Sequence, residues 1–122
     1  CVIPPGNAET ATAELLKAVA RRGEGSFLAV LKHFGNQPSL GMLSFPRPGT
    51  TLALDFPNRG EKTLRLLQAL DAIVQEAGGA LYPGKDARMP ASLFQSGYPQ
   101  WEAFSAYIDP HFSSRFWQRV TP

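Results

Sequence analysis

The sequence predicts an α+β fold: a ferredoxin-like βαββαβ domain with an antiparallel sheet, two helices on one face, and an aromatic-rich helical C-terminal tail. Two stretches place apolar residues at helical spacing and stop at glycines. Short apolar segments typical of strands precede and follow each stretch. Eight of the 13 aromatic residues lie between Phe94 and Trp117, so the last part of the chain must bury aromatic surface.

The first half of the chain is predicted to contain a strand, a helix and a second strand. Residues 1–3 are an apolar run that Pro4 interrupts, as at the end of a strand. Asn7 is a candidate cap for a helix over residues 8–22, because its side chain can accept a hydrogen bond from a free amide. Residues 27–34 form a strand that is apolar on both faces, which indicates a central place in the sheet.

The strand predicted over residues 50–56 decides which face of the sheet is covered. It follows a proline-rich connection over residues 35–49 and alternates between two faces. Because both crossover connections are expected to be right-handed, both helices should cover the same face. The side chains expected to point toward the helices are Leu52, Leu54 and Phe56. Those expected to point toward the open face are Thr51, Ala53 and Asp55.

A second helix and a last strand complete the predicted domain. Asn58 and Glu61 have the spacing of a capping box ahead of an amphipathic stretch, and Gly78 ends that stretch. Residues 80–82 are the last short strand.

The pattern changes at Met89, so we divide the chain into residues 1–88 and residues 89–122. Prolines break the second part into short pieces. Two helical stripes are predicted there, Trp101, Phe104 and Ile108 in one and Phe112, Phe116 and Trp117 in the other.

Composition limits the functional class. The net charge of +2 is too small to indicate binding to nucleic acid or to an anionic membrane. No apolar stretch approaches the roughly 20 residues that cross a bilayer. Cys1 is the single cysteine and cannot form an internal disulfide, which fits a reducing, cytoplasmic compartment. His33 and His111 lie apart from other metal-ligating residues, so we expect no metal site.

The turn after the last strand carries the first candidate site residues. Pro83 and Gly84 bend the backbone sharply, so the ammonium group of Lys85 can be held at one place on the edge of the sheet, beside Tyr82. A fixed cation of this kind can stabilise a developing negative charge. The alternative is a surface lysine in a polar turn.

Lys32 is the second candidate. It lies in a strand that is otherwise apolar on both faces, where a lysine is costly to bury without a partner. An edge position or a snorkelling side chain is the alternative explanation. Asp55 could pair with Lys32 across the sheet or could be solvated.

Four motifs contain or adjoin these residues: SFLAVLKHFG at 26–35, LSFPRPG at 43–49, DFP at 55–57 and YPGKD at 82–86. Together they resemble the C-terminal part of FAD-linked oxidases of the vanillyl-alcohol oxidase type. The resemblance is strongest to the branch of decaprenylphosphoryl-ribose oxidases and sugar-lactone oxidases. It extends from about Val2 to Arg88.

The resemblance implies roles for these residues. In this family the lysine that matches Lys85 contacts both flavin and substrate, and the tyrosine that matches Tyr82 borders the same site. Lys85 would be the catalytic electrostatic group, and Lys85 and Tyr82 would contact FAD. Lys32, Thr51 and Asp55 would line the substrate pocket with Tyr82. Thr51 and Ala53 replace an asparagine and a cysteine of that branch, so the resemblance does not extend to the substrate.

We therefore expect a C-terminal fragment of an FAD-dependent oxidoreductase that oxidises an alcohol carbon of a sugar, polyol or lactone by hydride transfer to flavin. Its partner would be a missing N-terminal FAD-binding domain, on which residues 89–122 would pack. The isolated fragment would lack activity and form homo-oligomers through its bare surface. The alternative is a free-standing ferredoxin-like module that binds a small ligand or a protein.

Overall fold

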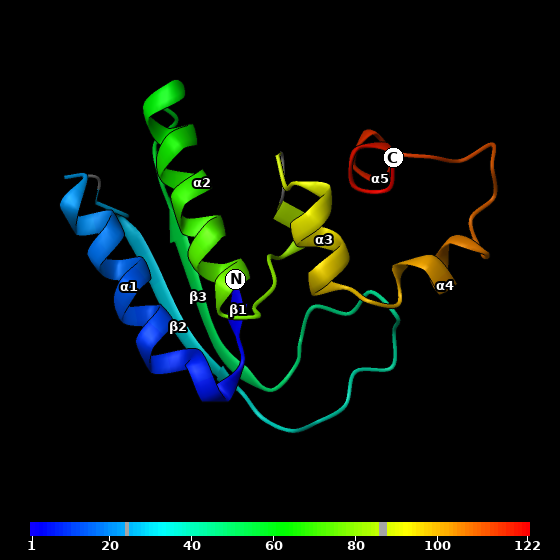
Figure 1. The fold of residues 1–122 in the computed structure, drawn as a ribbon, viewed down its shortest axis with the longest axis horizontal. Helices are drawn as coiled ribbons and strands as arrows, with labels where there is room; N and C mark the ends of the chain where they lie inside the picture. The colour runs from blue at the N-terminus through cyan, green and yellow to red at the C-terminus, as the bar shows by residue number, and fades with distance from the viewer. Residues whose placement is uncertain (24, 86–87) are drawn as a thin grey trace.

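The computed structural model describes residues 1–23, 25–85 and 88–122. Its three-stranded antiparallel sheet has the order β1-β3-β2, and the helices α1 and α2 lie together on one face of this sheet (Figure 1). The predicted α+β class, the antiparallel sheet and the position of both helices on one face are therefore confirmed. The strands are β1 (Val2–Ile3), β2 (Leu28–Phe34) and β3 (Gly49–Asp55), and the two helices are α1 (Ala8–Arg21) and α2 (Glu61–Glu76).

The strand predicted over residues 80–82 is present only as a single antiparallel bridge between Ala80 and Val2. With this bridge the order across the sheet is Ala80, β1, β3, β2, which is consistent with a ferredoxin-like domain. The extended segment stops because the short 3-10 helix η2 (Pro83–Lys85) begins immediately after Tyr82. Residues 86 and 87 of the YPGKD turn and its continuation lie outside the described residues.

The prediction that residues 27–34 form a central strand is wrong, because β2 lies at the edge and β3 is central. All seven residues of β2 pair with β3, from Leu28 opposite Asp55 to Phe34 opposite Gly49. Leu28 and Leu31 point to opposite faces and are 51% and 60% exposed. The apolar residues on both faces of β2 therefore mark uncovered surface in this chain, and not burial within the sheet.

Asn7 occupies the predicted N-cap position of α1, although its side chain makes no capping hydrogen bond, whereas the prediction that Asn58 caps α2 is wrong. Asn7 forms part of the 3-10 helix η1 (Pro5–Asn7), and its side-chain amide donates to the carbonyl of Ala77 at 3.2 Å. It thus connects the start of α1 to the end of α2. Asn58 accepts from the backbone N–H of Gly60 at 3.0 Å, and Gly60 occupies the N-cap position of α2 with φ of 63°. That left-handed conformation favours glycine. The helix α2 therefore begins after Gly60, later than a cap at Asn58 predicts.

The main core lies between the two helices and the sheet. Alternation along the strands places Ile3 and Leu52 on the side of the helices and Val2 and Thr51 on the other side. Each helix contributes one apolar stripe, as predicted. The buried members are Ile3, Ala11, Leu15, Val19, Leu52, Leu66, Leu70, Val74 and Ala77, and Leu54 and Phe56 pack against them.

The tail forms a second core around three short helices, α3 (Ala91–Gly97), α4 (Trp101–Ser105) and α5 (Arg115–Val120). It packs on Val2 and Ala80, so adjacent residues of β1 serve different cores. The α3 helix was not predicted, since its apolar residues are few. The buried members are Val2, Ala80, Met89, Leu93, Phe94, Tyr98 and Val120.

The long connection between β2 and β3 attaches to this tail core through Arg47. Its guanidinium group donates to the carbonyls of Ser44, Phe45 and Gly97, and its carbon Cζ lies 4.9 Å from the centroid of the Tyr98 ring. Residues 42 and 43 of this connection form a turn. We call this connection, residues 35–48, the strap. Arg47 anchors the strap to the tail core.

Candidate functional site

A cavity of about 580 Å³ runs along β3 between the helix layer and the turn that carries Lys85. We call it the β3 groove. One wall consists of residues 52–56, and Tyr82, Lys85 and Arg88 form the opposite wall. Its apolar roof is contributed by Leu67, Leu70 and Val74 of α2. Three of the residues predicted from sequence, Asp55, Tyr82 and Lys85, therefore line one cavity.

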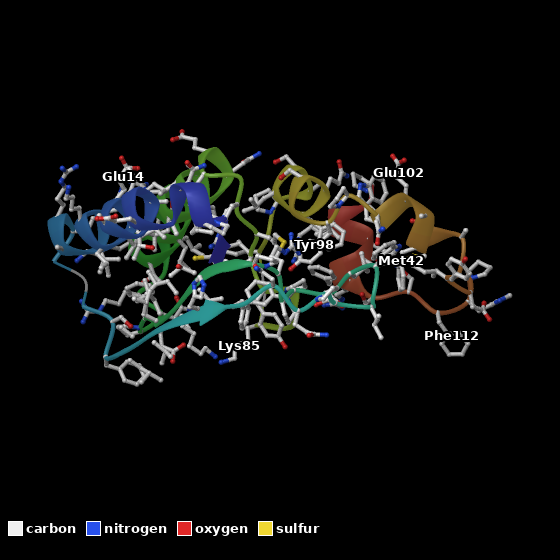
Figure 2. The ribbon with its side chains drawn as sticks, turned by 90° about the horizontal axis from the view of Figure 1, so that it is seen from below. Glu14, Met42, Lys85, Tyr98, Glu102 and Phe112 are labelled. Atoms are coloured by element: carbon white, nitrogen blue, oxygen red, sulfur yellow. The ribbon has the colours of Figure 1, made fainter. Side chains whose placement is uncertain are left out.

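Lys85 lies at the end of η2, and its backbone N–H is 3.5 Å from the carbonyl oxygen of Tyr82. Figure 2 shows Lys85 on the side of the sheet away from α1 and α2. Its side chain is exposed, so its ammonium group is accessible to a partner that covers this face.

Gly84 explains why the turn is so tight. A Cβ atom at this position would lie 2.8 Å from the Tyr82 ring, closer than real side chains approach. The Tyr82 ring in turn lies 5.1 Å from the ring of Phe45 on the strap. Tyr82 is thus held from two sides while 48% of it remains exposed.

An ion pair between Arg88 and Asp71 fastens the far end of this turn to α2. Arg88 Nη2 donates to Asp71 Oδ1 at 2.9 Å, and Nη1 donates to Oδ2. Asp71 is only 7% exposed. Our sequence reasoning missed this pair, although a carboxylate between Leu70 and Val74 on an apolar stripe signals a buried charge in need of a partner.

Lys32 and Thr51 lie opposite each other in the β2–β3 ladder and do not line the β3 groove. The Thr51 hydroxyl donates to the Lys32 carbonyl at 3.5 Å and is buried, whereas Lys32 is exposed. Asp55 is opposite Leu28, four residues from the Lys32–Thr51 pair and about 13 Å along the strand. The expected alternative of a Lys32–Asp55 pair is therefore wrong, and Lys32 lies on the edge strand.

Burial changes the proton affinity of two groups near these walls. Burial lowers the pKa of the Cys1 α-amino group below its usual value, and the negative charge of Asp71 opposes this effect. Burial raises the pKa of Tyr98 to about 12, against the weaker opposing effect of the Arg47 guanidinium. The Tyr98 hydroxyl donates to the carbonyl of Leu81 at 2.6 Å, directly before the candidate turn.

Other kinds of site find no support in the described part of the chain. No cluster of three or more His, Cys, Asp or Glu side chains there is suited to holding a metal ion. Among the same residues, no helix combines the length and the apolar character needed to cross a membrane.

The fold defines an α+β domain with an antiparallel sheet, and the sequence comparisons relate it to an oxidase. The chain is 39% identical over 97 residues to decaprenylphosphoryl-beta-D-ribose oxidase of Mycolicibacterium smegmatis, a match that covers 75% of this chain and 20% of that protein. It is 34% identical over 113 residues to a Streptomyces coelicolor protein described as "Uncharacterized protein in mprA 5'region", covering 90% of this chain and 30% of that protein.

These similarities confirm the predicted relationship to the FAD-linked oxidases. The chain spans about a fifth of the length of the first relative and about three tenths of the second. No family model matches the chain.

Proposed function

We propose that this chain is the substrate-side portion of a larger FAD-dependent oxidoreductase that oxidises an alcohol carbon of a sugar, polyol or lactone. The observation that carries the proposal is the similarity to an oxidase over 75% of the chain, together with Lys85 and Tyr82 on one wall of the β3 groove. In this proposal the N-terminal part of the longer protein holds most of the cofactor.

The residues at the open face fit the edge of a flavin ring. Lys85 provides an accessible ammonium group, and Tyr82 provides a ring held by Gly84 and Phe45. FAD, when bound, would accept the hydride from the alcohol carbon. Lys85 would contribute by stabilising negative charge that develops on the ring, because a fixed cation beside a forming anion lowers the barrier. Lys32 and Asp55 would contact polar groups of the substrate at the open face.

The uncovered apolar surface supports a missing partner domain. Phe27, Leu28 and Leu31 at the edge strand are 83%, 51% and 60% exposed, respectively. Surface of this kind marks an interaction site. We propose that the FAD-binding domain covers part of it, and that the isolated chain self-associates through it. A clean monomer in static light scattering at high concentration would argue against the second statement.

The decisive experiment uses the full-length protein that contains this chain. Anaerobic mixing with a panel of sugar, polyol and lactone alcohols should bleach the flavin absorbance for at least one class. Lys85→Met should slow this reduction by about 10²-fold or more. The matched control Lys17→Met, at an exposed position on α1, should leave the rate unchanged.

A second measurement separates this proposal from the free-standing module. The 122 residues alone should bind FAD weakly and should not reduce it with any of these alcohols. Tight flavin binding with turnover by the isolated chain would contradict the proposal that the N-terminal part of the longer protein holds most of the cofactor. If the full-length protein neither holds flavin nor reduces it, a ligand-binding or protein-interaction module becomes the better description.

A further inference from the structure

The carbonyl of Leu81 joins the segment before Tyr82 to the tail core. It accepts a hydrogen bond from the Tyr98 hydroxyl at 2.6 Å. One residue earlier, Ala80 exchanges two backbone hydrogen bonds with Val2 of β1, at 2.8 and 3.0 Å. The extended residues that lead into the candidate turn are therefore held twice in succession, first by the sheet and then by one side chain of the tail.

The Tyr98 side chain is itself closely held. It is 1% exposed, and its ring stacks on the ring of Phe94 with the centroids 5.1 Å apart. The guanidinium carbon of Arg47 lies 4.9 Å from the centroid of the same Tyr98 ring. A buried tyrosine hydroxyl needs a hydrogen-bond partner, and a ring held in this position directs its hydroxyl to the Leu81 carbonyl.

Arg47 also supports a second contact with the candidate turn. Its Nε donates to the carbonyl of Phe45 at 3.2 Å, which fixes the backbone of that residue. The ring of Phe45 lies 5.1 Å from the ring of Tyr82. The same guanidinium group therefore stands behind both side-chain contacts that reach this segment, one from Tyr98 and one from Phe45.

We propose that Arg47 and Tyr98 are positioning residues of the oxidoreductase proposed above, on which this inference rests. They set where the Tyr82 ring and the Lys85 ammonium group lie relative to the flavin. The backbone N–H of Lys85 is 3.5 Å from the Tyr82 carbonyl oxygen, so a shift of Tyr82 is carried to Lys85 within the single turn of η2. Neither Arg47 nor Tyr98 lines the β3 groove, so they act through the turn.

The two ends of the candidate turn are held by different parts of the molecule. After the turn, Arg88 pairs with Asp71 of α2. Before the turn, the contact comes from Tyr98 in the tail core. Lys85 lies between these two anchors, so the loss of one anchor should displace its ammonium group. A displacement of about 1 Å at a reacting group can slow a reaction by about 10²-fold.

The test is a double-mutant cycle on flavin reduction by the full-length protein. Tyr98→Phe removes only the hydroxyl and should slow reduction at saturating alcohol by about tenfold, because Lys85 is misplaced. The alcohol concentration at half saturation and the amount of bound FAD should change little. In the Lys85→Met background, Tyr98→Phe should change the rate by less than about twofold, since the group that it positions is gone.

A second variant and a matched control accompany this cycle. Arg47→Lys keeps the positive charge and loses the planar set of donors, so it should also slow reduction by about tenfold, and only when Lys85 is present. Tyr107→Phe removes a hydroxyl from a side chain that is 76% exposed, and it should leave the rate unchanged.

A further measurement does not depend on the reaction. In the full-length protein labelled with fluorotyrosine, the fluorine NMR signal of Tyr82 can be assigned with Tyr82→Phe. Tyr98→Phe should move this signal, because the Tyr82 ring shifts against the ring of Phe45. Tyr107→Phe should leave the signal in place.

Three results would each overturn the proposal. They are an unmoved Tyr82 signal, an unchanged rate in a protein that does reduce its flavin, and a Tyr98→Phe effect of equal size with and without Lys85. The last result is expected of a general structural loss. If the full-length protein does not reduce flavin at all, the oxidoreductase function fails. The Tyr82 signal then decides by itself whether Tyr98 positions the turn.

Discussion

The core between α1, α2 and the sheet consists of aliphatic side chains, whereas the core of the tail is built around Phe94 and Tyr98 and their neighbouring rings. In the first core, each element presents a periodic stripe to its neighbours. In the second, helices of five to seven residues meet through ring contacts such as Phe94 on Tyr98 at 5.1 Å and on Phe116 at 5.4 Å. Helices this short depend on tertiary packing, so the second core should be the easier one to disrupt.

Truncating Phe94 should give the largest difference between the two cores. Phe94 is 1% exposed, so Phe94→Ala should cost about 3–5 kcal/mol of unfolding free energy. Amides of α3 and α5 should exchange fast in this variant while those of α2 remain protected. Phe112→Ala, at a site that is 77% exposed, is the matched control and should change stability by about 0.5 kcal/mol or less. Equal loss of protection in both cores would show that they unfold as one unit.

The Arg88–Asp71 ion pair tests how firmly the candidate turn is joined to the first core. Arg88→Met leaves the Asp71 carboxylate buried without this partner and should cost about 2–3 kcal/mol in denaturant unfolding. The double variant Asp71→Leu with Arg88→Met should regain most of this loss, because an apolar pair of similar volume removes the unpaired charge. A double variant as unstable as the single one would mean that the turn needs the charges themselves.

Tyr98 reports on the second core through pH. Its pKa of about 12 in the folded chain lies above the ordinary value of about 10 in the unfolded chain. The unfolded chain therefore releases this proton first, so stability is present in full below about pH 10 and falls as pH rises toward 12. Tyr98→Phe should cost about 1–2 kcal/mol at neutral pH by leaving the Leu81 carbonyl without its donor. It should also remove this alkaline step from a plot of melting temperature against pH.

The Cys1 amine should give the smallest effect, and one of opposite sign. Burial lowers its pKa in the folded chain, so the unfolded chain holds the proton more tightly. Stability of this 122-residue chain should therefore rise slightly as pH increases up to about 8, the ordinary α-amino range. Asp71 weakens the effect because it favours the charged amine. Acetylating the amine should flatten this part of the profile, and an unchanged slope would assign it to other groups.

Much of the first core was predictable because its signals are local. The stripes of α1 and α2, the alternation of Leu52 and Leu54, and the glycine stop after α2 all follow from residue spacing. The sheet order was harder. The apolar residues on both faces of β2 suggested a central strand, yet the strand lies at the edge. The prediction failed because apolar residue types alone do not show whether a side chain is buried within the chain or exposed on its surface.

The candidate site was predicted in part. Tyr82 and Lys85 come from one short motif, so the structure brings them to the same wall, and Asp55 lies on the wall opposite. Lys32 does not line that groove, because the antiparallel register of β2 and β3 places it opposite Thr51 and not opposite Asp55. Asp71 and Asn7 act through partners 17 and 70 residues away, and spacing rules do not register contacts of that range.

The single arginine of the strap has a practical consequence for labelling. Arg47 ties the inner end of the connection to Gly97 and Tyr98, while Leu40 at the outer bend is fully exposed. A fluorophore or affinity tag inserted near Leu40 should therefore be tolerated, since loop length changes closure entropy only slowly. An insertion next to Arg47 would move its guanidinium group away from three carbonyl oxygens at once. A lysine at position 47 could not replace the arginine, because its single ammonium group does not have the planar set of donors of a guanidinium group.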